Sequence, residues 1–288
     1  MKVTRAAMPL LPLCQRMLPG RLAGLSLALL KATALEFAIL AGHLLLYPSG
    51  ITQERRGSSA RLPSSDGAAQ LPTETKPPVV LLHGFIDNRS VFVLLRRSLA
   101  QHGRQQVESL NYSPLTCDIR TAAELLGRHI EEICERTGSR HVDVVGHSLG
   151  GLIARYYVQR LGGDIRVRTL VTLGTPHSGT RVVPLANAHP IVRQMRPGSA
   201  LLEELTRPAP GCRTHFVSFW SDLDHLMDPL ETACIDHPDL MVQNVRVSGI
   251  GHLALPVHPA VATGIRQALD TERTGAEAAG RTGGLTVA

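Results

Sequence analysis

Aromatic residues are scarce in this chain of 288 residues, where they make up 3% and include a single tryptophan. The 30 lysines and arginines give a formal net charge of +6, but they do not gather into a basic stripe with interleaved aromatic side chains. Proteins that bind single-stranded nucleic acids combine basic grooves with aromatic surfaces on which bases stack. The composition therefore argues against a nucleic-acid-binding protein.

The five cysteines form no CxxC pair, which argues against a zinc site or a thiol redox motif. Cys14 lies in the N-terminal segment, so the main body holds an even number of cysteines, which is compatible with two disulfides in an exported domain. The order along the chain favours Cys212–Cys234 and Cys117–Cys134 as the pairs. The alternative is a set of reduced thiols in a cytosolic protein.

A long, uninterrupted apolar run is also missing. Residues 22–47 form the most apolar segment, and a helix of ~20 residues can cross a bilayer. Lys31, Glu36 and His43 interrupt this segment, and charged groups are costly in lipid. On a helix Glu36 and His43 share one polar stripe, which suits an interfacial or tilted anchor, or a helix packed on a domain. The A-x-A sequence at 32–34 leaves a signal peptide as a further alternative.

The chain divides into four parts by composition. We expect residues 1–48 to form an apolar anchor or signal-like helix, and residues 49–77, rich in Ser, Pro, Gly and charge, to form a flexible linker. Residues 78–270 are expected to form one domain, and residues 271–288 a disordered tail. The apolar segment and its neighbouring arginines favour a membrane-associated or secreted protein over a cytoplasmic one.

Within the expected domain, short apolar runs alternate with segments of helical periodicity. Nearly continuous apolar runs are typical of strands that are buried on both faces of a parallel sheet. The pattern predicts an α/β fold, with a mostly parallel sheet, helices on both faces and the apolar helix in front of it. The expected strands are residues 78–83, 105–110, 142–145, 167–173, 216–220 and 242–247, and the expected helices are residues 118–137, 149–161 and 256–269.

The stretch VDVVGHSLGG, residues 142–151, places a serine between a strand and a helix. Glycines two residues before and after Ser148 give the G-x-S-x-G pattern of a sharp turn that exposes a nucleophilic serine. Because Ser148 would stand at a helix N-terminus, the N–H of Leu149 can stabilise developing negative charge. A second such donor is expected in the loop after the first strand, at the N–H of Phe85.

A serine nucleophile needs a base and an acid that orients the base. His252 is the candidate base because it follows a strong strand in a loop with two glycines, whereas His258 precedes a proline and opens the last helix. Asp224 is the candidate acid, in a loop that can fold back onto the sheet, and Asp222 is the alternative. We interpret His83 as structural, since it precedes the serine in a tight loop.

Five motifs in the domain resemble one known family. They are VVLLHGF at 79–85, VDVVGHSLGGLIARYY at 142–157, VTLGTPHSGT at 171–180, SDLDHLMDP at 221–229 and GIGHLAL at 249–255. With them the chain resembles α/β-hydrolase lipases, especially bacterial class 2 lipases of the actinobacterial type, with kinship to the GPI inositol-deacylase-like branch. The resemblance implies that Ser148, Asp224 and His252 are the nucleophile, acid and base. It also implies an oxyanion hole at Phe85 and Leu149.

We therefore expect a serine carboxylic-ester hydrolase, a lipase or esterase, that cleaves lipid or acyl esters through an acyl-enzyme intermediate. No cofactor is expected, and the DHPD stretch at 236–239 lacks further ligands at a spacing that would suit a metal. We expect a monomer that binds no nucleic acid and that contacts a membrane surface. Residues 181–211 are expected either to cover the site as a lid or acyl-binding wall, or to form a surface connection. The alternatives are an acyltransferase or thioesterase with the same triad, or a non-catalytic membrane-anchored binding protein.

Overall fold

The protein is described by a computed structural model, which covers residues 20–51, 76–85, 87–113, 117–182, 189–271 and 286–287. Side chains of the N-terminal helix are described at residues 30–31, 33–48 and 50. Cys14, most of the expected linker and most of the expected tail lie outside the described residues, as do residues 183–188 of the expected lid segment.

The described strands form one sheet in which every neighbouring pair is parallel, in the order β2-β1-β3-β4-β5-β6-β7. The mostly parallel α/β fold predicted from the alternating pattern is confirmed. Two residues of the segment expected to be a disordered tail pair with β6 as the short strand β7. The strands are β1 Val79–Leu82, β2 Val107–Leu110, β3 Val142–His147, β4 Val167–Leu173, β5 His215–Ser221, β6 Met241–Val247 and β7 Thr286–Val287.

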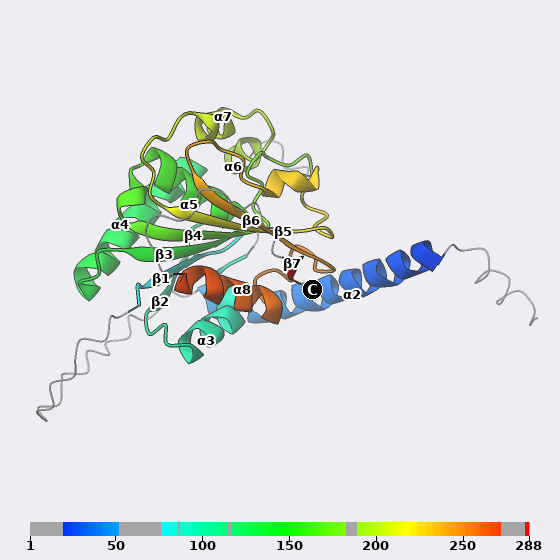
Figure 1. Cartoon of the computed structure of the whole chain (residues 1–288). Coiled ribbons are helices and arrows are strands. Elements are labelled where there is room, and N and C mark those ends of the chain that lie inside the picture. The colour runs from blue at the N-terminus through cyan, green and yellow to red at the C-terminus, as the bar shows by residue number, and fades with distance from the viewer. Residues whose placement is uncertain are drawn as a thin grey trace, which may run out of the picture.

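Helices cover both faces of the sheet (Figure 1), and each face has its own apolar core. Successive side chains of a strand point to opposite faces, so Val80 and Leu82 pack with α4 and α5, whereas Val79 and Leu81 pack with α3 and α8. The helices are α2 Gly20–Ile51, α3 Val93–Gln101, α4 Ile119–Thr137, α5 Leu149–Arg160, α6 Pro190–Gln194, α7 Ala200–Thr206 and α8 Pro259–Asp270. Three short 3₁₀ helices lie between them: η1 Arg89–Phe92, η2 Gly163–Ile165 and η3 Leu230–Ala233.

Helix α2 runs along the side of the domain that carries α3 and α8 and extends beyond it at its N-terminal end (Figure 1). Ile39 of α2 packs against the core on that side, and Glu36 and His43 also face the domain. Among the described residues, no helix has both the length and the apolar character needed to cross a membrane.

The expectation of two disulfides is wrong, because the four described cysteines are free. Cys117 precedes α4 and Cys134 lies near its other end, and a helix rises about 1.5 Å per residue, so these two thiols are far outside bonding range. Cys212 lies before the start of β5. Cys234 lies beside the middle of that strand, because the carbonyl of the adjacent Ala233 accepts a hydrogen bond from the hydroxyl of Ser218. The folded chain thus separates both pairs that the sequence order suggested.

Candidate active site

Ser148 occupies a strained turn between β3 and α5. Its φ is 52° and its ψ is −119°, and it is the one non-glycine residue with positive φ in the part of the chain that the structure describes. A Cβ on Gly146 would lie 2.6 Å from the backbone N of Gly151, and one on Gly150 would lie 2.4 Å from the carbonyl O of Leu82. The glycines therefore permit the close approach of strand and helix that holds the serine in this conformation.

Asp224 and His252 meet in the loops that follow β5 and β6. His252 Nδ1 and Asp224 Oδ2 are 2.7 Å apart, and both side chains are almost fully buried. The second carboxylate oxygen of Asp224 accepts from the N–H of Leu226 at 3.0 Å. Asp222, the alternative acid, instead accepts from the N–H of Gly249 and forms an ion pair with Arg246. The structure brings Asp224, and not Asp222, to the histidine.

The turn at Ser148 and the Asp224–His252 pair lie at the same edge of the sheet. The N–H of Ser148 donates to the carbonyl of Leu173, the last residue of β4. A Cβ on the next residue, Gly174, would lie 2.8 Å from Asp224 Oδ2 and 2.9 Å from His252 Nδ1. The backbone of Ser148 and the side chains of Asp224 and His252 thus meet beside the end of β4, at the carboxyl ends of the parallel strands, where open α/β sheets bind their ligands.

The loop after β1 lies beside the serine. A Cβ on Gly84 would be 3.5 Å from the Cβ of Ser148, so the backbone at Gly84 and Phe85 closes against the turn. Leu149 is buried at the first position of α5, where the N–H groups of a helix have no partner within the helix. Both residues predicted to supply oxyanion donors therefore belong to the segments that border Ser148.

Sequence reasoning missed a second set of polar side chains that extends from this site. The ring of His147 lies 4.8 Å from the ring of His252, and its Nε2 is 3.2 Å from the carbonyl O of His252. Asp87 lies 3.5 Å from Nδ1 of His147 and 3.6 Å from Nδ1 of His43 in α2. Glu36, also in α2, accepts hydrogen bonds from the loop of His252. The polar stripe of Glu36 and His43 indicated a helix that could pack on a domain, but the partners of these residues are distant in the sequence and no local motif marks them.

Neighbouring charges set the protonation of the site. Burial alone would lower the pKa of His252, but the negative charges of Asp224, Asp87 and Glu36 raise it above its ordinary value. Burial lowers the pKa of His147, although Asp87 opposes this effect. Burial also disfavours the charge on Asp87, yet the contacts with His147 and His43 bring the pKa of this carboxyl below its ordinary value. The arrangement stabilises the imidazolium form of His252, which makes it a stronger base, and it stabilises the ionised form of Asp87.

Comparisons with known structures identify the architecture. A family model described as the alpha/beta hydrolase fold matches residues 77–207. The crystal structure of mature Bacillus licheniformis lipase BlEst2 aligns with a TM-score of 0.59 over 71% of this chain and 96% of that chain, at 16% identity. Aspergillus fumigatus lipase B aligns with a TM-score of 0.61 over 68% of this chain and 53% of that chain, at 18% identity. This chain has the α/β-hydrolase fold.

Curated relatives of this chain match it over part of their length. A triacylglycerol lipase of Vibrio cholerae serotype O1 is 30% identical over 158 residues, which are 52% of this chain and 45% of the relative. A triacylglycerol lipase of Pseudarthrobacter phenanthrenivorans is 31% identical over 37% of this chain and 35% of the relative. A palmitoyl-protein thioesterase-dolichyl pyrophosphate phosphatase fusion of Schizosaccharomyces pombe is 30% identical over 43% of this chain and 20% of the relative. The chain spans less than half the length of these relatives.

Three further histidines near the strands and helices of this fold have contacts of their own. The ring of His83 stacks on the ring of Tyr112, with the ring centroids 4.4 Å apart. The backbone carbonyl of His83 accepts a hydrogen bond from the Tyr112 hydroxyl. His258 caps α8, where its Nδ1 accepts from the N–H of Ala260. His177 is buried with its Nε2 3.0 Å from the hydroxyl of Thr172. These contacts give each ring a structural partner, which agrees with the interpretation of His83.

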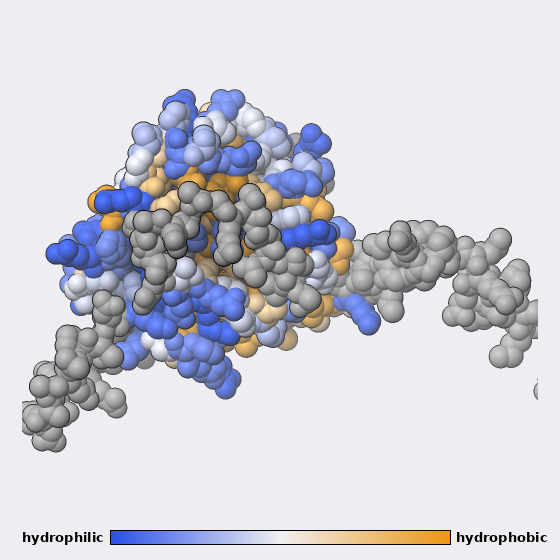
Figure 2. Space-filling view, viewed as in Figure 1, coloured by the Kyte–Doolittle hydropathy of each residue, from blue (hydrophilic) through white to orange (hydrophobic). Residues whose placement is uncertain are grey.

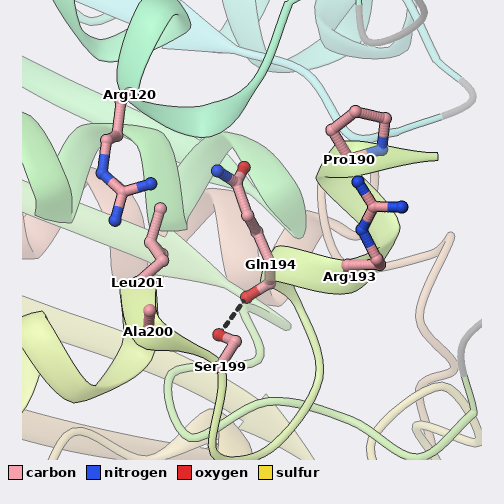
Figure 3. A pocket seen from close by; sticks show the side chains of 7 residues that line it. All are labelled: Arg120, Pro190, Arg193, Gln194, Ser199, Ala200 and Leu201. Atoms are coloured by element: carbon pink, nitrogen blue, oxygen red, sulfur yellow. Dashed lines mark hydrogen bonds between the residues drawn. The ribbon is translucent and has the colours of Figure 1, made fainter.

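Residues 190–206 form α6 and α7, whose buried leucine and isoleucine side chains join the core around α4 and α5. Between α4, α6 and α7 lies a cavity of about 340 Å³, lined among others by Arg120, Gln194 and Leu201 (Figure 3). Arg120 is held by Glu204 at 2.5 Å. Ser148, Asp224 and His252 do not line this cavity, so it is separate from the candidate site. On the face shown in Figure 2, apolar residues gather beneath the α6–α7 region.

In the described part of the chain, no group of histidine, cysteine, aspartate and glutamate side chains has an arrangement that could hold a metal ion.

Proposed function

We propose that this α/β hydrolase is a serine carboxylic-ester hydrolase, a lipase or esterase, with Ser148 as nucleophile. The observation that carries the proposal is the buried 2.7 Å contact between His252 and Asp224, beside a serine in a strained turn. A carboxylate on Nδ1 fixes the tautomer in which Nε2 can accept a proton from the serine hydroxyl.

The proposed reaction has two steps. Ser148 Oγ attacks the ester carbonyl carbon while His252 takes its proton, and the tetrahedral oxyanion is held by the N–H groups of Phe85 and Leu149. The C–O bond of the ester then breaks, and His252 returns the proton to the leaving alcohol. In the second step His252 takes a proton from a water that attacks the acyl carbon. The bond between that carbon and Ser148 Oγ then breaks, and His252 returns the proton to Oγ, which releases the carboxylic acid and regenerates the serine. Every group in this mechanism belongs to one chain, so the proposal requires only a monomer.

Lipid or acyl esters are the proposed substrates, and the names of the two lipase relatives support this class. The thioesterase named among the relatives favours acyl thioesters as a second candidate. Hydrolysis of an oxyester and a thioester that share one acyl chain separates the two. We also propose a membrane-associated or exported location, which the exposed apolar side chains of α2 support.

The test of the proposed function is the variant Ser148→Ala, assayed with p-nitrophenyl acyl esters of several chain lengths. We expect turnover to fall by several powers of ten, because the nucleophile is lost. A fluorophosphonate probe is expected to label Ser148 in the wild type and to leave the variant unlabelled. Ser139→Ala is the matched control, since this serine precedes β3 at the opposite edge of the sheet. A folded Ser148→Ala variant with undiminished turnover would exclude the proposed nucleophile.

A further inference from the structure

Glu36 binds the loop that carries the candidate base. Its Oε2 accepts from the N–H of Leu253 at 2.9 Å, and its Oε1 accepts from the N–H of Ala254 at 3.0 Å. These N–H groups belong to the two residues that follow His252, and Glu36 lies 217 and 218 residues away from them in the sequence. Both oxygens of one carboxylate therefore fix the backbone immediately after His252.

The packing around this contact leaves little space. A Cβ on Gly251 would lie 2.4 Å from Cδ of Glu36, so a side chain at this position would displace the carboxylate. On the other side of the loop, the carbonyl O of His252 lies 3.2 Å from Nε2 of His147. The ring of His252 is held by Asp224, while its backbone is held by Glu36 and His147.

Further contacts set the position of α2 along the domain. His43, two turns after Glu36, faces Asp87 in the loop that follows β1. Near the end of α2, the carbonyl of Tyr47 accepts from Asn88 Nδ2 at 2.8 Å, and the carbonyl of Gly50 accepts from Asn111 Nδ2 at 2.7 Å. Helix α2 thus contacts the loops after β6, β1 and β2, which lie at the edge of the sheet where Ser148 stands. A helix that only covered an apolar face would not need these polar contacts.

We propose that Glu36 is a positioning residue for the hydrolase reaction: by binding the backbone of residues 253 and 254 it holds His252 in place, and α2 is thereby part of the active site. This inference rests on the proposed function of Ser148 and His252. Glu36 does not touch the substrate and acts through the loop.

The charge of Glu36 supports this role. The groups that face His252 are Asp224 from the loop after β5, His147 at the end of β3, Asp87 from the loop after β1 and Glu36 from α2. The negative charge of Glu36 contributes to the raised pKa of His252. Removal of this charge is expected to lower that pKa and to move the acidic limb of the rate profile to lower pH.

The experiment compares the full chain with the variant Glu36→Gln, with Lys31→Gln as the matched control. Lys31 is an exposed charged residue on the same helix. In E36Q we expect faster hydrogen exchange at the amides of Leu253 and Ala254, and a lower pKa of the His252 imidazole in an NMR titration. The kcat for an ester is expected to fall about tenfold to a hundredfold, because small displacements of a catalytic group have such effects, with a smaller change in KM.

Two outcomes separate this inference from the proposed function. If the wild type hydrolyses esters and E36Q matches it at every pH, with the exchange at residues 253 and 254 and the pKa of His252 unchanged, the role of Glu36 is excluded and the proposed function stands. If the wild type neither hydrolyses esters nor reacts with a fluorophosphonate, the proposed function fails, and hydrogen exchange and the NMR titration still decide whether Glu36 holds the loop.

The variant Glu36→Asp keeps the charge on a shorter side chain. It should therefore restore part of the upward shift of the His252 pKa that Glu36→Gln removes. A destabilised E36Q whose His252 pKa stays at the wild-type value would also exclude the inference.

Discussion

Asp222 and Asp224 lie two residues apart and have different surroundings. Asp224 is buried against His252, whereas Asp222 is partly exposed beside Arg246. We predict that Asp224→Asn lowers kcat by about 10⁴-fold, as expected when the base loses the acid that orients it. Asp222→Asn is the matched change and should retain activity within a few fold. Esterase kinetics on the two purified variants make the comparison, and a larger loss in Asp222→Asn would reverse the assignment of the acid.

The residues brought together at the site differ in how far the sequence could predict them. Ser148 stands in a local pattern whose small neighbours are required by the turn, and His252 and Asp224 follow strands that could be recognised. His147 has no such signal, and the polar stripe of the N-terminal helix marks Glu36 only as a residue that could face a domain. Their roles depend on contacts between loops and a helix that are far apart in the chain, and a single sequence carries no pattern for such pairs.

Helix α2 has two different sides. Glu36 and His43 face the domain, whereas Leu30, Phe37 and Leu44 are 67%, 68% and 66% exposed. At about 100° per residue these three apolar side chains share one side of the helix, about a third of a turn from the polar pair. An interfacial helix places such a side against lipid. The polar stripe noted in the sequence thus binds the domain, and the apolar side supports the proposed membrane association.

We predict that the double substitution Phe37→Ser and Leu44→Ser weakens binding to lipid vesicles by at least about tenfold, because each buried apolar side chain contributes ~1.5 kcal/mol or more. Vesicle sedimentation with mixed neutral and anionic lipids measures the effect. Ile165→Ser is the control, since this exposed apolar residue lies in η2, away from α2. Equal binding of wild type and double variant would exclude α2 as the lipid-binding side.

The long amphipathic helix α4 was predicted from its apolar period, whereas the short helix α3 was not. Helix α4 begins after Asp118, whose carboxylate accepts from the N–H of Thr121, and it ends at Gly138 in the left-handed conformation. Helix α3 buries only Leu95 and Leu99, and its exposed Val93 and Leu94 obscure the helical period. The predicted disulfide pairs were wrong for a different reason: the order of cysteines along the chain does not indicate which ends of helices and strands lie close together in the fold.

The pH dependence of stability is a property of the whole molecule, because several histidines are buried in different layers. Burial lowers the pKa of four of them below the ordinary value, and His177 is the most strongly affected. These four residues are His83, His147, His177 and His215. His252 has a raised pKa, so its contribution to stability is present below the ordinary pKa and is lost as the pH rises through the folded value.

We predict that the free energy of unfolding decreases as the pH falls from about 7.5 to about 5.5. Histidines of the unfolded chain take up protons near their ordinary pKa of ~6.5, whereas in the fold burial disfavours the protonated form of these four rings, and the four are more numerous than the one histidine with a raised pKa, His252. Urea denaturation at both pH values measures the change. His177→Asn should reduce the pH dependence, and equal stability of the wild type at both values would contradict the prediction.

The contacts of α2 have a consequence for where the functional unit begins. The matched family model starts at residue 77, and a chain shortened to that point would keep Ser148, Asp224 and His252. It would lose Glu36, whose carboxylate oxygens accept hydrogen bonds from the N–H groups of Leu253 and Ala254. The matched family model therefore begins after the helix that binds this loop, and a unit cut at that boundary would lack one part of the proposed active site.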